Sequence, residues 1–452
     1  MINLKLLFCV TIAIGTVTTA FAEASKLNES RTVKTGEDPM ARHEIFPGRG
    51  RCSGALGHSI TLGAPRTFIW RPEWLAFEKQ RVAQDRTYAK PLIDAANAAL
   101  GRGPYSVIDK TTIAPSGDRH DYYSIGPYWW PTEGKPNGEP YSRRDGRVNP
   151  DSRSDSFDKS RMARFGTDVR VLALAYHHLG DRHYANHAAN LLRAWFVSAD
   201  TRMNPNLNHG QALPGVNHGR GEGIIELNAL SDVVESIGLI EPAGAMTKGE
   251  LASLKQWFTN LTQWMATSSI GKAERDKNNN HGLHYDYLIT HFALFAGRET
   301  LAQQVVMNFP ARRIAVQMKS DGSLPEELAR TRSWHYSFYA LEAATKLATL
   351  GECVGLDLWS AETRDDRGLA KAFAFLAPYQ ADMTKWPYKD TGLTDPAKRD
   401  AVRRVAMEPL RMMAWGTGNM GYERLAANHD VTLDATADYW LPPMNDQESA
   451  QP

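Results

Sequence analysis

The sequence predicts a predominantly α-helical domain built from antiparallel helix hairpins that are arranged as a toroid. Apolar residues recur at helical spacing in segment after segment between residues 72 and 415. Short turns join these segments on one side, and long loops rich in Pro, Gly and Asn join them on the other. No segment has a sustained alternation of apolar and polar residues, so an all-α class is the one with support.

The N-terminus is typical of a cleavable signal peptide. A lysine precedes an apolar run, and Ala20-Phe21-Ala22 fits the small-residue rule for cleavage. We therefore expect residues 1–22 to be removed and the mature chain to begin at Glu23. No other stretch is long enough to span a bilayer, which predicts an exported protein that is periplasmic or, alternatively, secreted.

Composition limits the partners of the chain. Its 452 residues are 42% hydrophobic and 23% charged, which is enough for a sizeable core. Cleavage would remove one of 52 Lys and Arg and none of 51 Asp and Glu, so the mature chain is formally neutral. General attraction to nucleic acid or to a membrane surface is not supported, and no obligate protein partner is evident.

Two cysteines, Cys52 and Cys353, remain in the expected mature chain. Export permits a disulfide between them. Cys52 lies in a Gly-rich extension, residues 23–65, that we expect to be packed on the surface or partly disordered. The sequence therefore favours two free thiols over the bridge.

The expected helices follow from apolar spacing and from their caps. Helical spacing starts at Pro72, which suits an early-turn position, and continues to residue 100. Thr247 and Glu250 form a capping box for the helix that follows them. The other expected helices are 159–179 and 184–196, which turn at Gly180-Asp181, then 224–240, 281–297, 299–307, 333–350, 367–377 and 400–415.

The helix that starts at His281 is expected to be an inner helix of the toroid. Tyr285 and Leu288 lie on one of its faces, and Leu283 and Tyr287 lie on the opposite face. Because both faces are apolar, one should pack on an outer helix and the other should point toward the barrel interior.

A long irregular stretch covers residues 104–158 and is dense in Pro, Gly, Asn and aromatic residues. Loops of this length inside a compact domain are usually functional. We predict a stacking platform for sugar rings and guanidinium groups for carboxylates, formed by Tyr122, Tyr123, Tyr128, Trp129, Trp130, Arg143 and Arg144. The alternatives are a Trp pair that only holds the loop down and an Arg pair that is solvated.

Two further stretches carry candidate chemistry. Three asparagines run into His281, which indicates an anion-facing helix mouth, or else a capping run with a structural histidine. Tyr336 points away from the packing stripe of its helix, and Arg330 is close enough in sequence to lower the pKa of that phenol. In the alternative interpretation, Tyr336 is a packing contact and Arg330 pairs with Glu326 or Glu327.

Five motifs, in order, resemble the alginate lyase superfamily of bacterial polysaccharide lyases, and the resemblance covers about residues 66–420. They are DYYSIGPYWWP, GEPYSRRDGRVNP, LLRAWFVSADTRMNPNLNHGQALPGVNHGRGEGII, KNNNHGLHYDY and LPEELARTRSWHYSFYAL. The resemblance implies an incomplete (α/α) toroid as the catalytic domain, which we place at residues 66–440 with a C-terminal tail at 441–452.

The resemblance also implies the reaction, a β-elimination in 4-O-linked uronate polymers that needs no cofactor and no metal. Its catalytic residues correspond to Asn280, His281, Arg330 and Tyr336. We expect the substrate to be bound by Tyr128, Trp129, Trp130, Arg143, Arg144, Asn208, His209 and Asn217. The extra asparagine, the six-residue separation of Arg330 from Tyr336, and His209 leave the preferred uronate open, so that glucuronan is an alternative to alginate.

Three rival interpretations remain. A metal site would use His281 with His284, or His183 with His187, although no H-E-x-x-H motif or Cys/His cluster is present. A glycoside hydrolase would need two acids from the set Asp118, Asp121, Asp145, Glu222, Glu226, Glu326 and Glu327. A non-catalytic uronate-binding protein is the third.

Overall fold

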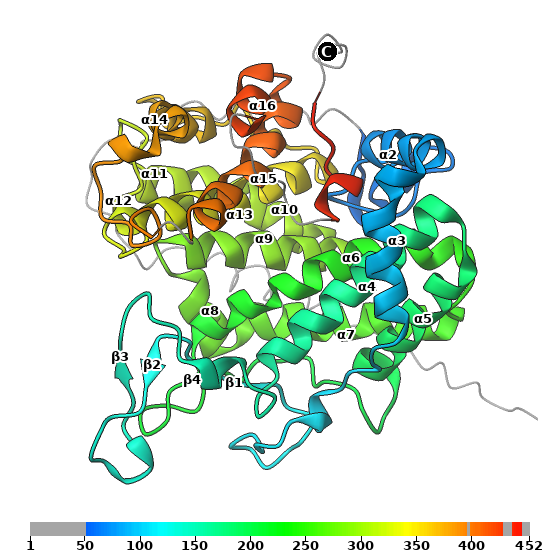
Figure 1. Cartoon of the computed structure of the whole chain (residues 1–452), viewed down its shortest axis with the longest axis horizontal. Coiled ribbons are helices and arrows are strands. Elements are labelled where there is room, and N and C mark those ends of the chain that lie inside the picture. Colours follow the sequence, from blue (N-terminus) through cyan, green and yellow to red (C-terminus); the bar gives the residue numbers. More distant parts are fainter. Residues whose placement is uncertain (1–50, 396–397, 428–435, 445–452) are drawn as a thin grey trace, which may run out of the picture. The chain divides into compact units, whose positions relative to one another are not determined.

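Five long helices, each in contact with the next, form the inner layer of the fold (Figure 1). They are α4 (Lys159–Leu179), α6 (Asn228–Ile240), α9 (Asn280–Phe295), α13 (Ser333–Cys353) and α15 (Arg399–Thr417). This computed structural model describes residues 51–395, 398–427 and 436–444. The predicted all-α class, an incomplete (α/α) toroid of helix hairpins, is confirmed.

Outer helices cover this inner layer. The remaining helices are α2 (Pro72–Gln84), α3 (Arg86–Leu100), α5 (Arg182–Leu192), α7 (Lys248–Thr267), α8 (Ser269–Arg275), α10 (Glu299–Phe309), α11 (Ala315–Gln317), α12 (Pro325–Leu328), α14 (Leu369–Ala381) and α16 (Met420–Ala427). Helices α3 and α5 pack on α4, α7 and α10 pack on α9, and α16 packs on α15. One continuous hydrophobic core runs between the two layers.

Local sequence signals determine several helix ends. Gly180 ends α4 with a φ of 78°, a left-handed conformation that glycine adopts without steric cost. Thr247 and Glu250 form the predicted capping box at the start of α7. Asp85 accepts hydrogen bonds from the backbone N–H groups of Thr87 and Tyr88, which starts a new helix. The single helix expected from residue 72 to residue 100 is therefore two helices.

Two other expected helix bounds were wrong. The helix expected at 224–240 begins as a 3₁₀ segment, Gly221–Leu227, and becomes α-helical at Asn228. The helix expected at 184–196 ends at Leu192 and continues as a π-helical turn, Arg193–Val197. The second long loop, residues 198–220, lies between these two irregular segments, and tertiary contacts there override local helix propensity.

Helix α9 is buried along its length, as its two apolar faces predicted. Arg313 joins α9 to the segment that precedes this helix. It donates to both carboxylate oxygens of Asp286 in α9, at 2.6 and 2.8 Å. It also donates to the backbone carbonyls of Arg275 and Lys277, which lie before α9. A Cβ at Gly282 would lie 2.1 Å from the Lys277 carbonyl oxygen and 2.4 Å from Arg313. A glycine is therefore required where the turn and the guanidinium approach α9.

Strand structure in the described residues is confined to the two long loops. Strand β1 (Tyr123–Ile125) pairs in parallel with β4 (His209–Ala212), and β2 (Trp129–Trp130) pairs antiparallel with β3 (Ser142–Arg143). These pairings fold both loops over the same end of the helices.

A disulfide joins Cys52 and Cys353, so the expectation of two free thiols was wrong. The segment that carries Cys52 packs on the helical core: Cys52 and His58 are buried, and the backbone N–H of Ala55 donates to Glu299 of α10. Tertiary packing thus brings the two cysteine Cα atoms to 4.4 Å, although 301 residues separate them in sequence.

The expected signal peptide, residues 1–22, and residues 23–50 of the expected extension lie outside the described residues, as do residues 445–452 of the expected tail. Residues 441–444 are described, and Leu441 is fully buried in the core. Within the described part of the chain, no helix combines the length and the apolar character needed to cross a bilayer.

The Arg313–Asp286 pair gives a test of this architecture. We expect Asp286→Asn to lower the free energy of unfolding by about 3–5 kcal/mol, because it leaves a buried guanidinium without its counter-charge. Urea denaturation measures the change. Asp276→Asn is the matched control: Asp276 pairs with the neighbouring Arg312 at the surface, and we expect a loss below about 1 kcal/mol. Equal losses in the two variants would contradict the anchoring role.

Candidate active site

A cavity of about 690 Å³ opens where β2 and β3 meet the N-terminal ends of α9 and α13. It brings together the four residues expected to carry the chemistry, Asn280, His281, Arg330 and Tyr336. Tyr128, Trp129 and Arg143 of the first long loop line it as well.

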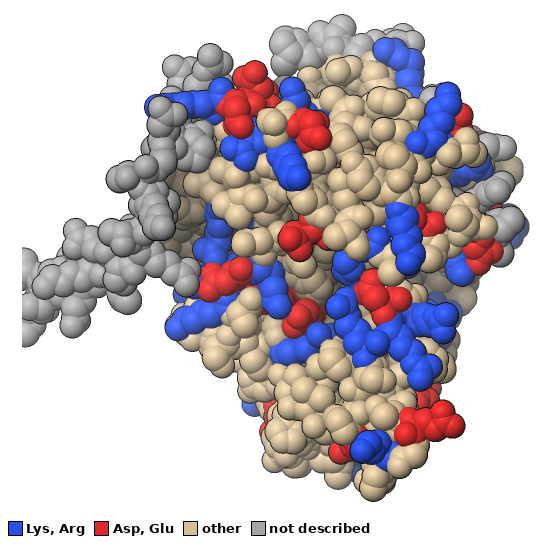
Figure 2. Space-filling model, turned by 90° about the vertical axis from the view of Figure 1, so that its left-hand side faces the viewer, with Lys and Arg blue, Asp and Glu red and all other residues tan. Residues whose placement is uncertain are grey.

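The cavity wall is strongly cationic although the whole chain is nearly neutral. Seven of its lining residues are Lys or Arg and two are Glu. The cations are Arg143, Arg153, Lys159, Arg220, Lys277, Arg330 and Arg332. Figure 2 views the side of the molecule that bears β2, β3 and α12, and shows Lys and Arg gathered across the middle of this face. The local excess of positive charge suits an anionic ligand.

Tyr336 lies at the wall with its hydroxyl 2.7 Å from the hydroxyl of Tyr128. The guanidinium of Arg330 stacks over the Tyr336 ring at 3.8 Å from its centroid. Burial raises the pKa of Tyr336 above the ordinary value of a phenol, and Tyr128 raises it further, whereas Arg330 lowers it. The predicted effect of Arg330 on this pKa is thus present, but it is smaller than the effect of burial.

Arg330 pairs with Asp145, not with Glu326 or Glu327 as the alternative interpretation proposed. Its Nη2 donates to Asp145 at 2.9 Å, and the hydroxyl of Thr331 donates to the same carboxylate. Although burial opposes ionisation, these two donors hold the pKa of Asp145 below its ordinary value. Arg143 donates to Asp145 as well, at 2.7 Å, so this carboxylate links β3 to the segment before α13.

His281 is oriented by a buried carboxylate. Its Nδ1 lies 2.6 Å from Oε1 of Glu274, a residue of α8 whose side chain is fully buried. A carboxylate is an acceptor, so Nδ1 carries the hydrogen of this contact, and Nε2 is the ring nitrogen that the contact leaves free. Asn279 caps α9 by accepting from the backbone N–H of His281. Asn279, and not Asn280, is therefore the helix cap.

Asn280 is fully buried and forms part of the cavity wall. Its backbone N–H donates to Oε1 of Glu327 in α12, and its side-chain Nδ2 donates to Oε2 of the same carboxyl at 2.8 Å. The remaining amide atom, Oδ1, is buried and has no hydrogen-bond partner.

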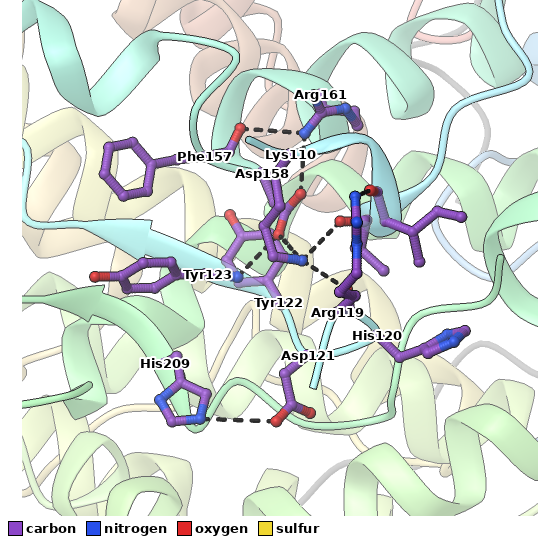
Figure 3. A network of polar contacts seen from close by, with 12 residues as sticks. Lys110, Arg119, His120, Asp121, Tyr122, Tyr123, Phe157, Asp158, Arg161 and His209 are labelled. Carbon is purple, nitrogen blue, oxygen red and sulfur yellow. Dashed lines mark hydrogen bonds and ion pairs between the residues drawn. The ribbon is translucent and has the colours of Figure 1, made fainter. Parts of the chain in front are cut away.

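The first long loop is held down by a buried polar network (Figure 3). Lys110 donates to the backbone carbonyls of Val107 and Arg119 and pairs with Asp158 at 3.2 Å. Asp158 accepts from Arg161 and from the backbone N–H of Tyr123. These contacts fix β1 against the start of α4.

Some aromatic and Arg residues of the first loop lie away from the cavity. Tyr122 is fully buried and donates to Glu226, which excludes it from a stacking platform. Tyr123 packs edge-on against Phe157. Trp130 stacks with Arg144 and donates to the carbonyl of Arg147, so the Trp130 and Arg144 side chains hold the loop together.

The three expected binding residues of the second loop also lie outside the cavity lining. Asn208 accepts from the indole N–H of Trp264, and Asn217 accepts from the backbone N–H of Leu213 within a turn. His209 contacts the carbonyl of His218 and lies 3.7 Å from Asp121 (Figure 3). All three stabilise the loop, a role that their polar character did not distinguish from ligand binding.

The sequence interpretation missed several lining residues. Weak signals were present: Arg220 lies in the NHGRGEG motif, Lys277 directly precedes the asparagine run, and His335 and Tyr339 flank Tyr336 on one helix. Burial and the nearby Arg332 and Arg330 lower the pKa of His335 to about 3, so this imidazole is neutral beside Tyr336.

The histidine pairs considered for a metal have separate partners. His284 contacts Asn228 and the carbonyl of Tyr339, whereas His281 contacts Glu274. His183 contacts Asp181, and His187 contacts the carbonyl of Arg102. In the part of the chain that the structure describes, no three His, Cys, Asp or Glu residues form a group able to hold a metal ion.

Comparison with known proteins decides the family. The sequence profile of the family described as Alginate lyase matches residues 106–386, more than half of the chain. The chain belongs to the alginate lyase family. Membership of this family supports polysaccharide lyase activity. No curated protein matches the sequence.

Solved structures agree with this assignment. An alginate lyase from Bacteroides ovatus is 34% identical, has a TM-score of 0.80, and covers 84% of this chain and 100% of its own. A variant of alginate lyase A1-III complexed with a tetrasaccharide is 15% identical, with a TM-score of 0.51 over 75% of this chain and 88% of its own. At that identity, A1-III supports the toroid fold alone.

Proposed function

We propose that this family member cleaves 4-O-linked uronate polymers, alginate first among them, by β-elimination. The products would carry an unsaturated uronate at the new non-reducing end. The observation that carries the proposal is the convergence of Asn280, His281, Arg330 and Tyr336 in one cavity whose wall has a large excess of cations.

The chemistry begins with the uronate carboxylate. Removing H5 leaves an electron pair that the carboxylate accepts as an enediolate, so neutralising this carboxylate lowers the barrier. Donors from Asn280 and Arg330 supply that neutralisation, and the step requires no metal. The electron pair then forms the C4–C5 double bond as the C4–O4 bond breaks, and the leaving oxygen takes up a proton.

Stereochemistry divides the two proton transfers. In mannuronate and glucuronate, H5 and the leaving oxygen lie on the same side of the ring, so Tyr336 serves as base and then as acid. In guluronate they lie on opposite sides, so Nε2 of His281 removes H5 and Tyr336 protonates the leaving oxygen. The His281–Glu274 contact engages Nδ1 and leaves Nε2 as the nitrogen available to the substrate, which supports this second role.

The surroundings of three candidate acids, Glu222, Asp145 and Glu226, favour elimination over hydrolysis. A hydrolase needs a proton-donating carboxyl and a second carboxylate across the bond. Glu222 lines the cavity, but despite its burial Arg220 and Lys277 hold its pKa below the ordinary value. Asp145 and Glu226 are engaged by hydrogen bonds to neighbouring side chains.

We also propose export to the periplasm, with secretion as the alternative. The support is the expected signal peptide at residues 1–22 and the Cys52–Cys353 disulfide, because disulfides persist in oxidising compartments.

The reaction type is tested with polymannuronate, polyguluronate and glucuronan. The mature protein should raise the ultraviolet absorbance of unsaturated uronate in step with new reducing ends. New reducing ends without absorbance would indicate a hydrolase, and neither signal on any of the three polymers would contradict the proposal.

The two proton-transfer roles predict different losses. Tyr336→Phe should reduce kcat by at least about 10²-fold on every substrate, because the only proton carrier common to all of them is lost. His281→Ala should spare mannuronate cleavage more than guluronate cleavage. Tyr184→Phe, whose hydroxyl contacts Asn97 away from the cavity, is the control. Near-normal activity of Tyr336→Phe would contradict the assignment of Tyr336 as the proton-transfer residue.

The Tyr128–Tyr336 contact predicts a change in pH dependence. A phenolate base makes kcat/KM rise with pH until Tyr336 is ionised. Tyr128→Phe removes a group that raises the pKa of Tyr336 and keeps Arg330, which lowers it, so the rising limb should move to lower pH. The pH profile of mannuronate cleavage measures this, and a move to higher pH would contradict it.

A further inference from the structure

The contact between Asn280 and Glu327 raises a question that the proposed function does not answer. The proposal needs a donor from Asn280 to the substrate carboxylate, yet Nδ2 is engaged by Glu327 and Oδ1 faces no partner. Asn280 borders the cavity, so a carboxylate bound there would lie near an amide whose one unpaired atom is an oxygen with lone pairs. Such an arrangement is unfavourable in a site where charge is poorly screened.

An amide side chain has nearly the same shape when its oxygen and nitrogen exchange places. Turning the Asn280 amide would bring Oδ1 to Oε2 of Glu327 and aim Nδ2 at the cavity. Two acceptors would then meet, unless Oε2 carries a hydrogen. The backbone N–H of Asn280 already donates to Oε1, so Oε2 is the oxygen available for protonation.

We infer that Glu327 is a positioning residue: as a neutral carboxylic acid it donates from Oε2 to Oδ1 of Asn280, and so turns the amide N–H groups toward the substrate carboxylate. This arrangement satisfies the buried Oδ1, keeps the backbone contact at Oε1, and supplies the donor. The inference rests on the proposed elimination reaction, and it assigns a role to a residue that touches no substrate.

The surroundings of Glu327 favour its neutral form. The side chain is almost fully buried in α12 against the start of α9. Burial raises the pKa of Glu327, and the opposing influences are the Asn280 donors and the charged groups Arg330 and His281. A second ionised carboxylate this close to a uronate carboxylate would also oppose the neutralisation that the elimination needs.

The decisive comparison is between Glu327→Gln and Glu327→Ala. A Gln donates to Oδ1 and accepts from the backbone N–H as a neutral Glu does, so kcat/KM should stay within about threefold of wild type. Glu327→Ala removes both contacts and should lose roughly tenfold or more. Glu362→Gln, which removes an exposed carboxylate outside the cavity lining, is the matched control.

An ionised Glu327 predicts the opposite pattern. An ionised Glu327 accepts from both the backbone N–H and Nδ2 of Asn280. A Gln at this position has one acceptor oxygen, and its amide N–H₂ group would face the second donor, so it cannot replace both acceptors. A Glu327→Gln variant as impaired as Glu327→Ala would therefore overturn the inference. The Glu327→Ala loss should also disappear in an Asn280→Ala background, because Glu327 acts through Asn280. A full additional loss there would count equally against it.

Two further readouts separate positioning from mere stabilisation. Wild-type kcat/KM should fall at alkaline pH as Glu327 ionises, and Glu327→Gln should lack that falling limb. The infrared difference between wild type and Glu327→Gln at neutral pH should contain the carbonyl band of a protonated carboxyl. A carboxylate band in its place would overturn the inference without any activity measurement. Absence of lyase activity in wild type would instead refute the proposed function.

Discussion

The geometry of the cavity depends on how helix α9 is held at its start. The Arg313–Asp286 ion pair is buried, and the same guanidinium binds the carbonyls of Arg275 and Lys277, which precede the helix. One side chain thereby fixes both the helix and the turn that leads into it. Asn280 and His281 follow directly, so their positions are determined by contacts made deep in the core.

The opposite wall depends on a clamp between a loop and a helix. Asp145 and Tyr128 of the first long loop contact Arg330 and Tyr336. The Lys110–Asp158 network stabilises the ordered conformation of this loop. The loop can therefore present polar groups at the edge of the cavity and leave the cavity open. The positive charge of Arg330, which stacks on the Tyr336 ring, lowers the pKa of Tyr336. Asp145 partly neutralises that charge through its ion pair with Arg330.

Much of the fold could be predicted because its signals are local. The α7 capping box, the Gly180 turn and the two apolar faces of α9 each depend on residues only a few positions apart. The Cys52–Cys353 disulfide could not be predicted, because it depends on how an irregular segment packs 301 residues away from its partner. The same reason explains the missed Asp145–Arg330 pair.

By itself, the sequence determined the helical class and the four residues that the cavity brings together. Helix periodicity, caps and the five ordered motifs are written along the chain. Tertiary structure alone decided which polar groups line the cavity and which stabilise loops. Arg143 lines the cavity, whereas its neighbour Arg144 stacks on Trp130 within the loop. It also decided the partner of each group, Glu274 for His281 and Glu327 for Asn280. Protonation depends on burial and on neighbours from distant segments, and neither can be read from residue order.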